Sequence, residues 1–167
     1  NTWFNSAVSE DVNWMDGYNG LGWSYAKLMV LDSSIDNFIT GLSKPQDKWN
    51  PTDIHSEILA GLTFAYHAKG IDKKTIEYGR AFLDSTVKPL KAGWVFTHDS
   101  LLNYLDVRIT LAASYFSVGK FDSASLNVQI VLDSLNSSVI AVSDTSLEGR
   151  KKMAEQISAL QTSLLKQ

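Results

Sequence analysis

The sequence contains no cysteine. Without thiols the chain forms no disulfide, has no thiolate nucleophile and offers no sulfur ligand to a metal ion. Histidine is scarce too, and His55, His67 and His98 stand in different segments. Their positions lack the His-Glu-x-x-His spacing that places two ligands on one helix face. We therefore expect neither a metal ion nor another cofactor.

Long apolar runs and concentrated positive charge are also missing. No stretch approaches the roughly 18 consecutive apolar residues that a membrane-spanning helix needs. The net charge is -3, and no basic run is longer than Arg150-Lys151-Lys152. Binding to nucleic acid requires a strongly basic face. The sequence thus argues against a membrane span and against a nucleic-acid partner.

Motifs that carry catalysis are absent as well. The sequence has no Gly-x-Ser-x-Gly, no glycine-rich phosphate loop and no nucleophile paired with a base. Its acidic residues alternate with basic ones, as in Glu77 and Arg80, at the spacing of ordinary ion pairs on a helix surface. We expect a protein without enzymatic activity.

The most informative feature present is an internal repeat. Three stretches carry leucine, a small residue and then tyrosine three positions later, namely Leu21-Gly22…Tyr25, Leu62-Thr63…Tyr66 and Leu111-Ala112…Tyr115. Apolar residues around them recur at the three-and-four spacing of one helix face. Such recurrence is typical of stacked helical units. A chain of 167 residues, 44% hydrophobic and 20% charged, is also sufficient for one globular domain.

We predict a single all-α domain over residues 1–167. Its expected parts are a partial unit at 1–13, helix-turn-helix units at about 15–48, 52–88 and 101–136, and a capping helix at about 145–166.

Polar residues mark the expected helix starts. Asp32-Ser33-Ser34 is predicted to cap the second helix of the first unit, and Pro51 is expected at the entrance of the next unit. Residues 88–100 are predicted to form a loop held by Trp94 and Phe96. The helix after this loop is expected to be capped by Thr97, Asp99 or Ser100.

These residues resemble the tetratricopeptide repeat, a helix-turn-helix unit of about 34 residues. The family pattern has an aromatic residue, Leu-Gly and Tyr on the first helix, Gly at the turn, and Ala and an aromatic residue on the second. The three units together keep Tyr18, Leu21, Gly22, Tyr25, Phe38, Leu62, Tyr66, Gly70, Leu111, Tyr115, Gly119 and Ala124. They depart from it at Met29, Ser34, Thr63, Thr75 and Ala112. The resemblance implies an α-α superhelix.

Two segments are similar to parts of tetratricopeptide proteins of the bacterial cell envelope, which are often lipoproteins. They are residues 18–23 (Tyr-Asn-Gly-Leu-Gly-Trp) and 94–99 (Trp-Val-Phe-Thr-His-Asp). This similarity implies a location in the envelope or outside the cell after removal of a signal sequence, and leaves the cytoplasm open.

Proteins of this family hold a peptide or protein in a concave groove lined by the first helix of each pair. Carried over to this chain, the resemblance places in the groove Asn19, Trp23, Lys27, Ala60, Phe64, His67, Ile109, Ala113 and Phe116. Three of these, Trp23, Phe64 and Phe116, would form an aromatic strip suited to an apolar partner. The same aromatic side chains would equally fit a role in the core.

A second hypothesis is self-assembly, in which copies stack end to end into an oligomer or a filament. Repeated contact between different surfaces builds a filament whenever the arrangement does not close. The residues that motivate this hypothesis are Trp3, Phe4 and Trp14 near the start, and Leu160, Leu164 and Leu165 near the end.

Overall fold

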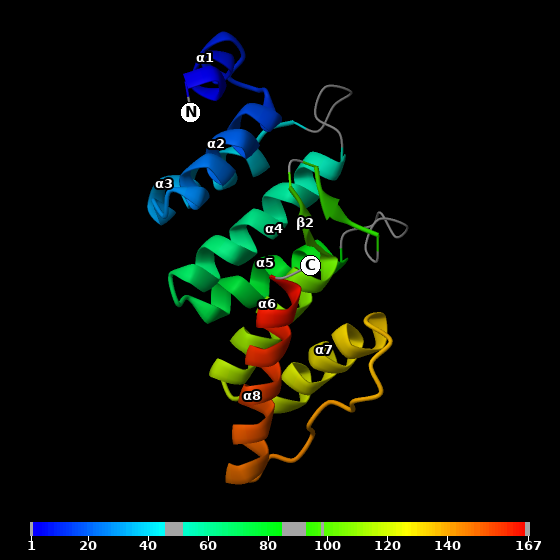
Figure 1. Cartoon of the computed structure of the whole chain (residues 1–167). Helices are drawn as coiled ribbons and strands as arrows, with labels where there is room; N and C mark the ends of the chain where they lie inside the picture. The colour runs from blue at the N-terminus through cyan, green and yellow to red at the C-terminus, as the bar shows by residue number, and fades with distance from the viewer. Residues whose placement is uncertain (1, 46–51, 85–92, 98, 166–167) are drawn as a thin grey trace. The chain divides into compact units, whose positions relative to one another are not determined.

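The computed structural model describes residues 2–45, 52–84, 93–97 and 99–165, which are all-α apart from one small sheet. The chain divides into two compact units, unit 1 (Asn1–Val87) and unit 2 (Lys88–Gln167). Within each unit, helices that follow one another along the chain pack side by side (Figure 1). The predicted all-α fold class is therefore confirmed.

In the part of unit 1 that the structure describes there are five helices. They are α1 (Thr2–Glu10), α2 (Met15–Lys27), α3 (Leu31–Leu42), α4 (Thr52–Ala68) and α5 (Asp72–Asp84). Helices α2 and α3 form one hairpin, α4 and α5 form the next, and α4 also packs against both α2 and α3. Their apolar stripes meet in a core formed by Met15, Ile35, Phe38, Ile58, Leu62 and Ala65.

Phe38 is the centre of that core, and two glycines make room for its ring. A Cβ atom built at Gly22 on α2 or at Gly61 on α4 would collide with the Phe38 ring. Phe38 on α3 is fully buried. The two glycines therefore let α2 and α4 approach the same aromatic side chain closely, which is the role of small residues where helices cross.

The described residues of unit 2 form two short antiparallel strands followed by three helices. These elements are β1 (Val95–Phe96), β2 (Asp99–Asn103), α6 (Tyr104–Ser117), α7 (Phe121–Ser134) and α8 (Leu147–Leu164). Helix α6 packs against both α7 and α8. A helix is present where the C-terminal helix was predicted: α8, orange to red in Figure 1. Its buried side chains belong to the unit 2 core and are Met153, Ile157, Leu160 and Leu164.

Two predicted helix starts are wrong. Helix α6 is capped by Asn103, whose side chain accepts from Leu105 N at 2.8 Å, while Asp106 accepts from Asn103 N at 2.8 Å. The candidates Thr97, Asp99 and Ser100 come too early because the chain continues as a strand to Asn103. Similarly, α3 begins at Leu31, directly after Val30, so Asp32-Ser33-Ser34 lies inside the helix.

The prediction that residues 88–100 form a loop is wrong where this segment forms strands. A two-stranded sheet pairs Phe96 with Asp99 and Val95 with Asn103. Trp94 and Phe96 are buried, as expected of residues that hold this segment in place. Residues 88–92 and His98, as well as Pro51, lie outside the described residues.

The three hairpins turn in the same way. In each, a left-handed residue follows the first helix, at Met29 (φ 58°), Gly70 (φ 71°) and Gly119 (φ 75°). The next residue then donates its backbone N–H to the carbonyl of the repeated tyrosine. These bonds are Val30 N to Tyr25 O at 3.0 Å, Ile71 N to Tyr66 O at 2.9 Å and Lys120 N to Tyr115 O at 2.9 Å. Each turn thus ends the helix as a Schellman motif does.

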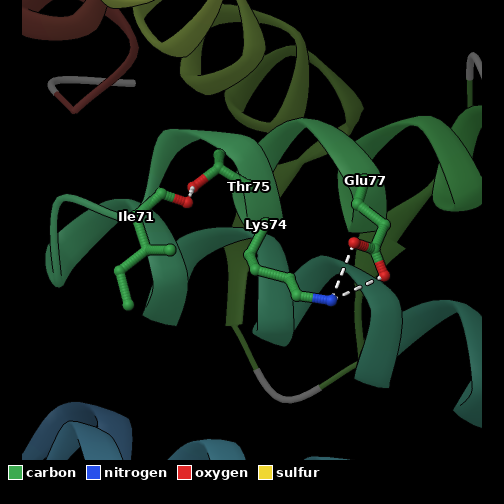
Figure 2. A network of polar contacts seen from close by, with 4 residues as sticks. All are labelled: Ile71, Lys74, Thr75 and Glu77. Carbon is green, nitrogen blue, oxygen red and sulfur yellow. Dashed lines mark hydrogen bonds and ion pairs between the residues drawn. The ribbon is translucent and has the colours of Figure 1, made fainter.

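The second helices of the first two hairpins, α3 and α5, each bury one hydroxyl-bearing side chain. Ser34 and Thr75 are both fully buried. The Ser34 hydroxyl donates to Gly22 O on the neighbouring helix at 2.8 Å. The Thr75 hydroxyl donates to Ile71 O at 3.3 Å, and on α5 the Lys74 ammonium donates to both oxygens of Glu77 (Figure 2). Buried hydroxyls are tolerated here because each has an acceptor.

Candidate partner-binding surface

Six of the residues predicted to bind a partner lie in unit 1, on helices α2 and α4, and one of them, Ala60, is fully buried. Asn19, Trp23 and Lys27 follow one another at intervals of four on α2, and Phe64 and His67 are three apart on α4. Such intervals place side chains on one helix face. Because α2 and α4 pack against each other, we name these five residues the α2–α4 surface.

At one end of this surface, Asn19 connects the two helices. It is 1% exposed, and its Nδ2 donates to Glu57 Oε2 at 2.8 Å and to Asp16 Oδ1 at 3.2 Å. Its Oδ1 is buried and accepts no hydrogen bond from the residues that the structure describes. Glu57 itself is 3% exposed. Asn19 therefore acts mainly as a structural link between α2 and α4, and Glu57 is a buried carboxylate that the sequence pattern did not single out.

At the centre, Trp23 joins the surface to the core. Its ring meets Phe38 edge to face at a centroid distance of 5.6 Å and lies 6.2 Å from the Phe64 ring at 52°. Trp23 and Phe64 are both half-buried. Each side chain is therefore partly packed against its neighbours and partly exposed, which fits either of the two roles considered for these aromatic residues.

At the other end are the two basic side chains. Lys27 is exposed, and His67 is half-buried. Burial lowers the pKa of His67, and the negative charge of Asp72 opposes this shift. His67 thus favours the neutral form near pH 7, in which one ring nitrogen donates a hydrogen bond and the other accepts one.

The remaining groove residues lie in unit 2. Ile109 is 3% exposed and belongs to the unit 2 core, so its side chain is occupied by packing. Phe116 is half-buried and meets Phe121 edge to face at 5.4 Å. Ala113 is half-buried and packs against the same core, so Phe116 is the one large side chain of the three that is partly exposed.

The residues of the self-assembly hypothesis have very different surroundings. Trp3 on α1 is 89% exposed. Phe4 packs its ring on Gly20 of α2, and Trp14 is half-buried beside Gly17. Leu160 and Leu164 are buried in the unit 2 core, whereas Leu165 is exposed.

Neither metal chemistry nor a membrane span finds support in the described part of the chain. No three histidine, aspartate or glutamate side chains gather there in a way that would hold a metal ion. None of the helices described has the length and apolar character needed to cross a bilayer. His55, whose pKa burial lowers, and His67 belong to different ends of α4.

Compared with protein-family models, with curated proteins and with solved structures, the chain matches none of them.

Proposed function

We propose that this protein is a non-enzymatic interaction module that binds a peptide or protein segment on the α2–α4 surface. The observation that carries the proposal is the contact between Trp23 and Phe64, two half-buried rings from the first helices of consecutive hairpins. Large aromatic residues that are partly packed and partly presented contribute most of the binding energy in many interfaces.

The flanking groups support a partner that is largely apolar with a few polar contacts. Lys27 carries N–H donors and the neutral His67 ring has both a donor and an acceptor nitrogen, and the two residues follow the aromatic rings toward the C-terminal ends of α2 and α4. Their positions on one surface would give an extended segment an aromatic anchor and polar contacts that set its direction.

The recurring turn supports the proposed relation to tetratricopeptide repeats. Three hairpins share the same left-handed residue position and the same bond to the repeated tyrosine carbonyl. Three equivalent hairpins in one chain fit an internal repeat, and proteins built from such repeats commonly serve as binding scaffolds. We also propose a location in the bacterial cell envelope, and the basis for this is the resemblance to tetratricopeptide proteins of the envelope.

The test is selection of a random-peptide phage library on the immobilised full chain, followed by fluorescence anisotropy with the enriched peptides. We expect Trp23→Ala and Phe64→Ala each to weaken binding by about tenfold or more. Tyr78→Ala is the matched control, because Tyr78 is also half-buried in unit 1 but stacks on Tyr66 at 5.4 Å. If Trp23→Ala and Phe64→Ala bind the peptides as tightly as the control Tyr78→Ala and the wild type do, the α2–α4 surface is not the binding site. Circular dichroism checks that each variant is folded.

Self-assembly is the second candidate, and one observation favours it. Trp3 is 89% exposed on α1, a helix that buries none of its own residues. A second copy covering Trp3 would remove a large apolar side chain from water.

Light scattering over a concentration series, with electron microscopy of the same samples, tests this candidate. Self-assembly is supported if the mass grows with concentration in the wild type and in Trp23→Ala but not in Trp3→Glu. Trp3 is a better target than Phe4, because Phe4 already packs on Gly20 within the chain. A constant monomer mass would exclude it.

A further inference from the structure

Arg108 on α6 is a half-buried cation held by uncharged groups. Its Nε donates to the Tyr104 hydroxyl at 2.8 Å, and its Nη1 donates to Asn127 Oδ1 at 3.0 Å. The guanidinium carbon lies 5.1 Å from the centre of the Tyr104 ring. These contacts fix the plane of the guanidinium group.

The two residues that hold Arg108 are fixed in turn. Asn127 on α7 is 5% exposed, and its Nδ2 donates to Ser123 O at 2.8 Å, which directs its oxygen toward Arg108. Tyr104 is the first residue of α6, and its backbone N–H donates to Trp94 O at 3.0 Å. A ligand that binds Arg108 would therefore find it already ordered, and little side-chain entropy would be lost.

No counter-charge accompanies this cation within the described residues. The ion pairs there join Lys69 to Asp32, Lys74 to Glu77 and Lys152 to Glu148, and none includes Arg108. A buried charge is ordinarily paired with an opposite charge, and an anion that covered the half-buried Arg108 would provide that pairing. Arginine has five N–H donors. The two bonds to Tyr104 and Asn127 use part of this capacity and leave N–H groups for an anion.

We propose that Arg108 is a binding site for a carboxylate of a protein or peptide partner. A planar guanidinium forms two parallel hydrogen bonds with a carboxylate, and this geometry is more specific than the point charge of a lysine. One carboxylate neutralises the single positive charge, whereas a phosphate dianion would leave an excess negative charge at a half-buried position. The site lies in unit 2 and does not depend on the α2–α4 surface.

The direct test follows the Arg108 Nε–H signal by nuclear magnetic resonance in the ¹⁵N-labelled full chain. The probes are acetyl-Ala-Glu-Ala-amide, its glutamine counterpart, acetyl-Ala-Ala-Ala with a free carboxyl terminus, and inorganic phosphate. We expect the glutamate peptide or the free terminus to move the signal at concentrations at least about tenfold lower than the glutamine peptide does. Which of the two acts more strongly identifies a side-chain or a terminal carboxylate.

Variants provide the second part of the test. Arg108→Gln should abolish the response in the surrounding backbone signals, and Arg108→Lys should weaken it by about tenfold because the planar donor pair is lost. Arg150→Gln is the matched control. Arg150 also has its Nε bonded to a protein oxygen, Thr145 O at 2.7 Å, and lies 4.6 Å from the Phe121 ring centre, but it is exposed.

An unmoved Arg108 signal, an equal response to the glutamine peptide, or a response to phosphate alone would each overturn the proposal. The wild-type signal decides the matter even if Arg108→Gln does not fold. Trp23→Ala should leave carboxylate binding unchanged, so failure of this site and failure of the α2–α4 surface can be told apart.

Discussion

At the scale of single residues, Met29 occupies a backbone position that the other two hairpins give to glycine. Its φ is 58°, close to the 71° of Gly70 and the 75° of Gly119. A side chain in this left-handed region costs about 1–2 kcal/mol. At Gly70 and Gly119 an added Cβ would meet nothing within 4 Å, so the cost of a substitution there is purely conformational.

We therefore expect Met29→Gly to raise the free energy of unfolding by about 1 kcal/mol, and Gly70→Ala to lower it by a similar amount. Urea unfolding followed by circular dichroism measures both. A stabilising effect of Gly70→Ala would show that the turn does not need the left-handed conformation.

The half-buried histidines make stability depend on pH. Burial lowers the pKa of His67 and of His55 from the ordinary value of 6.5, and Asp72 partly opposes the shift at His67. The folded chain therefore binds these protons less tightly than the unfolded chain. The stabilising contribution is present above pH 6.5 and is lost as the pH falls below it.

We expect the free energy of unfolding to decrease between about pH 6.5 and pH 5, and to decrease less in His67→Gln. Asp106, whose pKa burial raises, acts in the opposite direction in both proteins. The difference between their urea-unfolding curves across this pH range therefore isolates His67. A steeper loss of stability with falling pH in His67→Gln than in the wild type would contradict the predicted direction of the His67 contribution.

At the scale of elements, α1 is held to α2 by two close contacts. The Phe4 ring covers Gly20, and a Cβ at Gly17 would lie 2.6 Å from Val8 Cγ1. A methyl group at Gly20 would occupy the space of the Phe4 ring. Helix propensity alone would favour alanine over glycine by about 1 kcal/mol, so packing and propensity predict opposite outcomes.

We expect packing to dominate, so that Gly20→Ala detaches α1 and removes amide hydrogen-exchange protection from residues 2–10. Ser6→Ala, at an exposed position of α1, is the control that should keep this protection. Retained protection in Gly20→Ala would show that Phe4 can move aside.

The helices also show which local sequence signals are sufficient to predict where a helix lies. The periodic stripes located α2, α4, α6 and α8, because a helix that buries one face must repeat its apolar residues along that face. Helix starts were predicted less well. Helix α3 starts after Val30 because the preceding turn ends there, and α6 starts after Asn103 because the preceding strand ends there. A nearby aspartate or serine in the sequence does not indicate where that turn or strand ends.

At the scale of the whole molecule, each unit has a core of its own. Phe38 and Met153 are fully buried at the centres of the unit 1 and unit 2 cores respectively. Truncation of either side chain removes apolar contacts and leaves a cavity inside one unit.

We expect Phe38→Ala to lower stability by about 3–5 kcal/mol and Met153→Ala by about 2–5 kcal/mol. Hydrogen exchange should show the loss mainly in unit 1 for the first variant and mainly in unit 2 for the second. Ile39→Ala, at a position 42% exposed, is a control expected to change little. Equal loss of protection in both units from either variant would show that they unfold together.

The sequence by itself determined the all-α class, the approximate places of the helices and part of the candidate surface. The resemblance to tetratricopeptide repeats placed Trp23 and Phe64 among the candidate binding residues, and the structure brings their rings together. Only the tertiary structure decided that Glu57 bonds to Asn19 across 38 positions and that Arg108 is held by Asn127 across 19. Periodicity describes the residues along one helix, whereas a hydrogen bond between helices depends on how far apart and at what angle they pack.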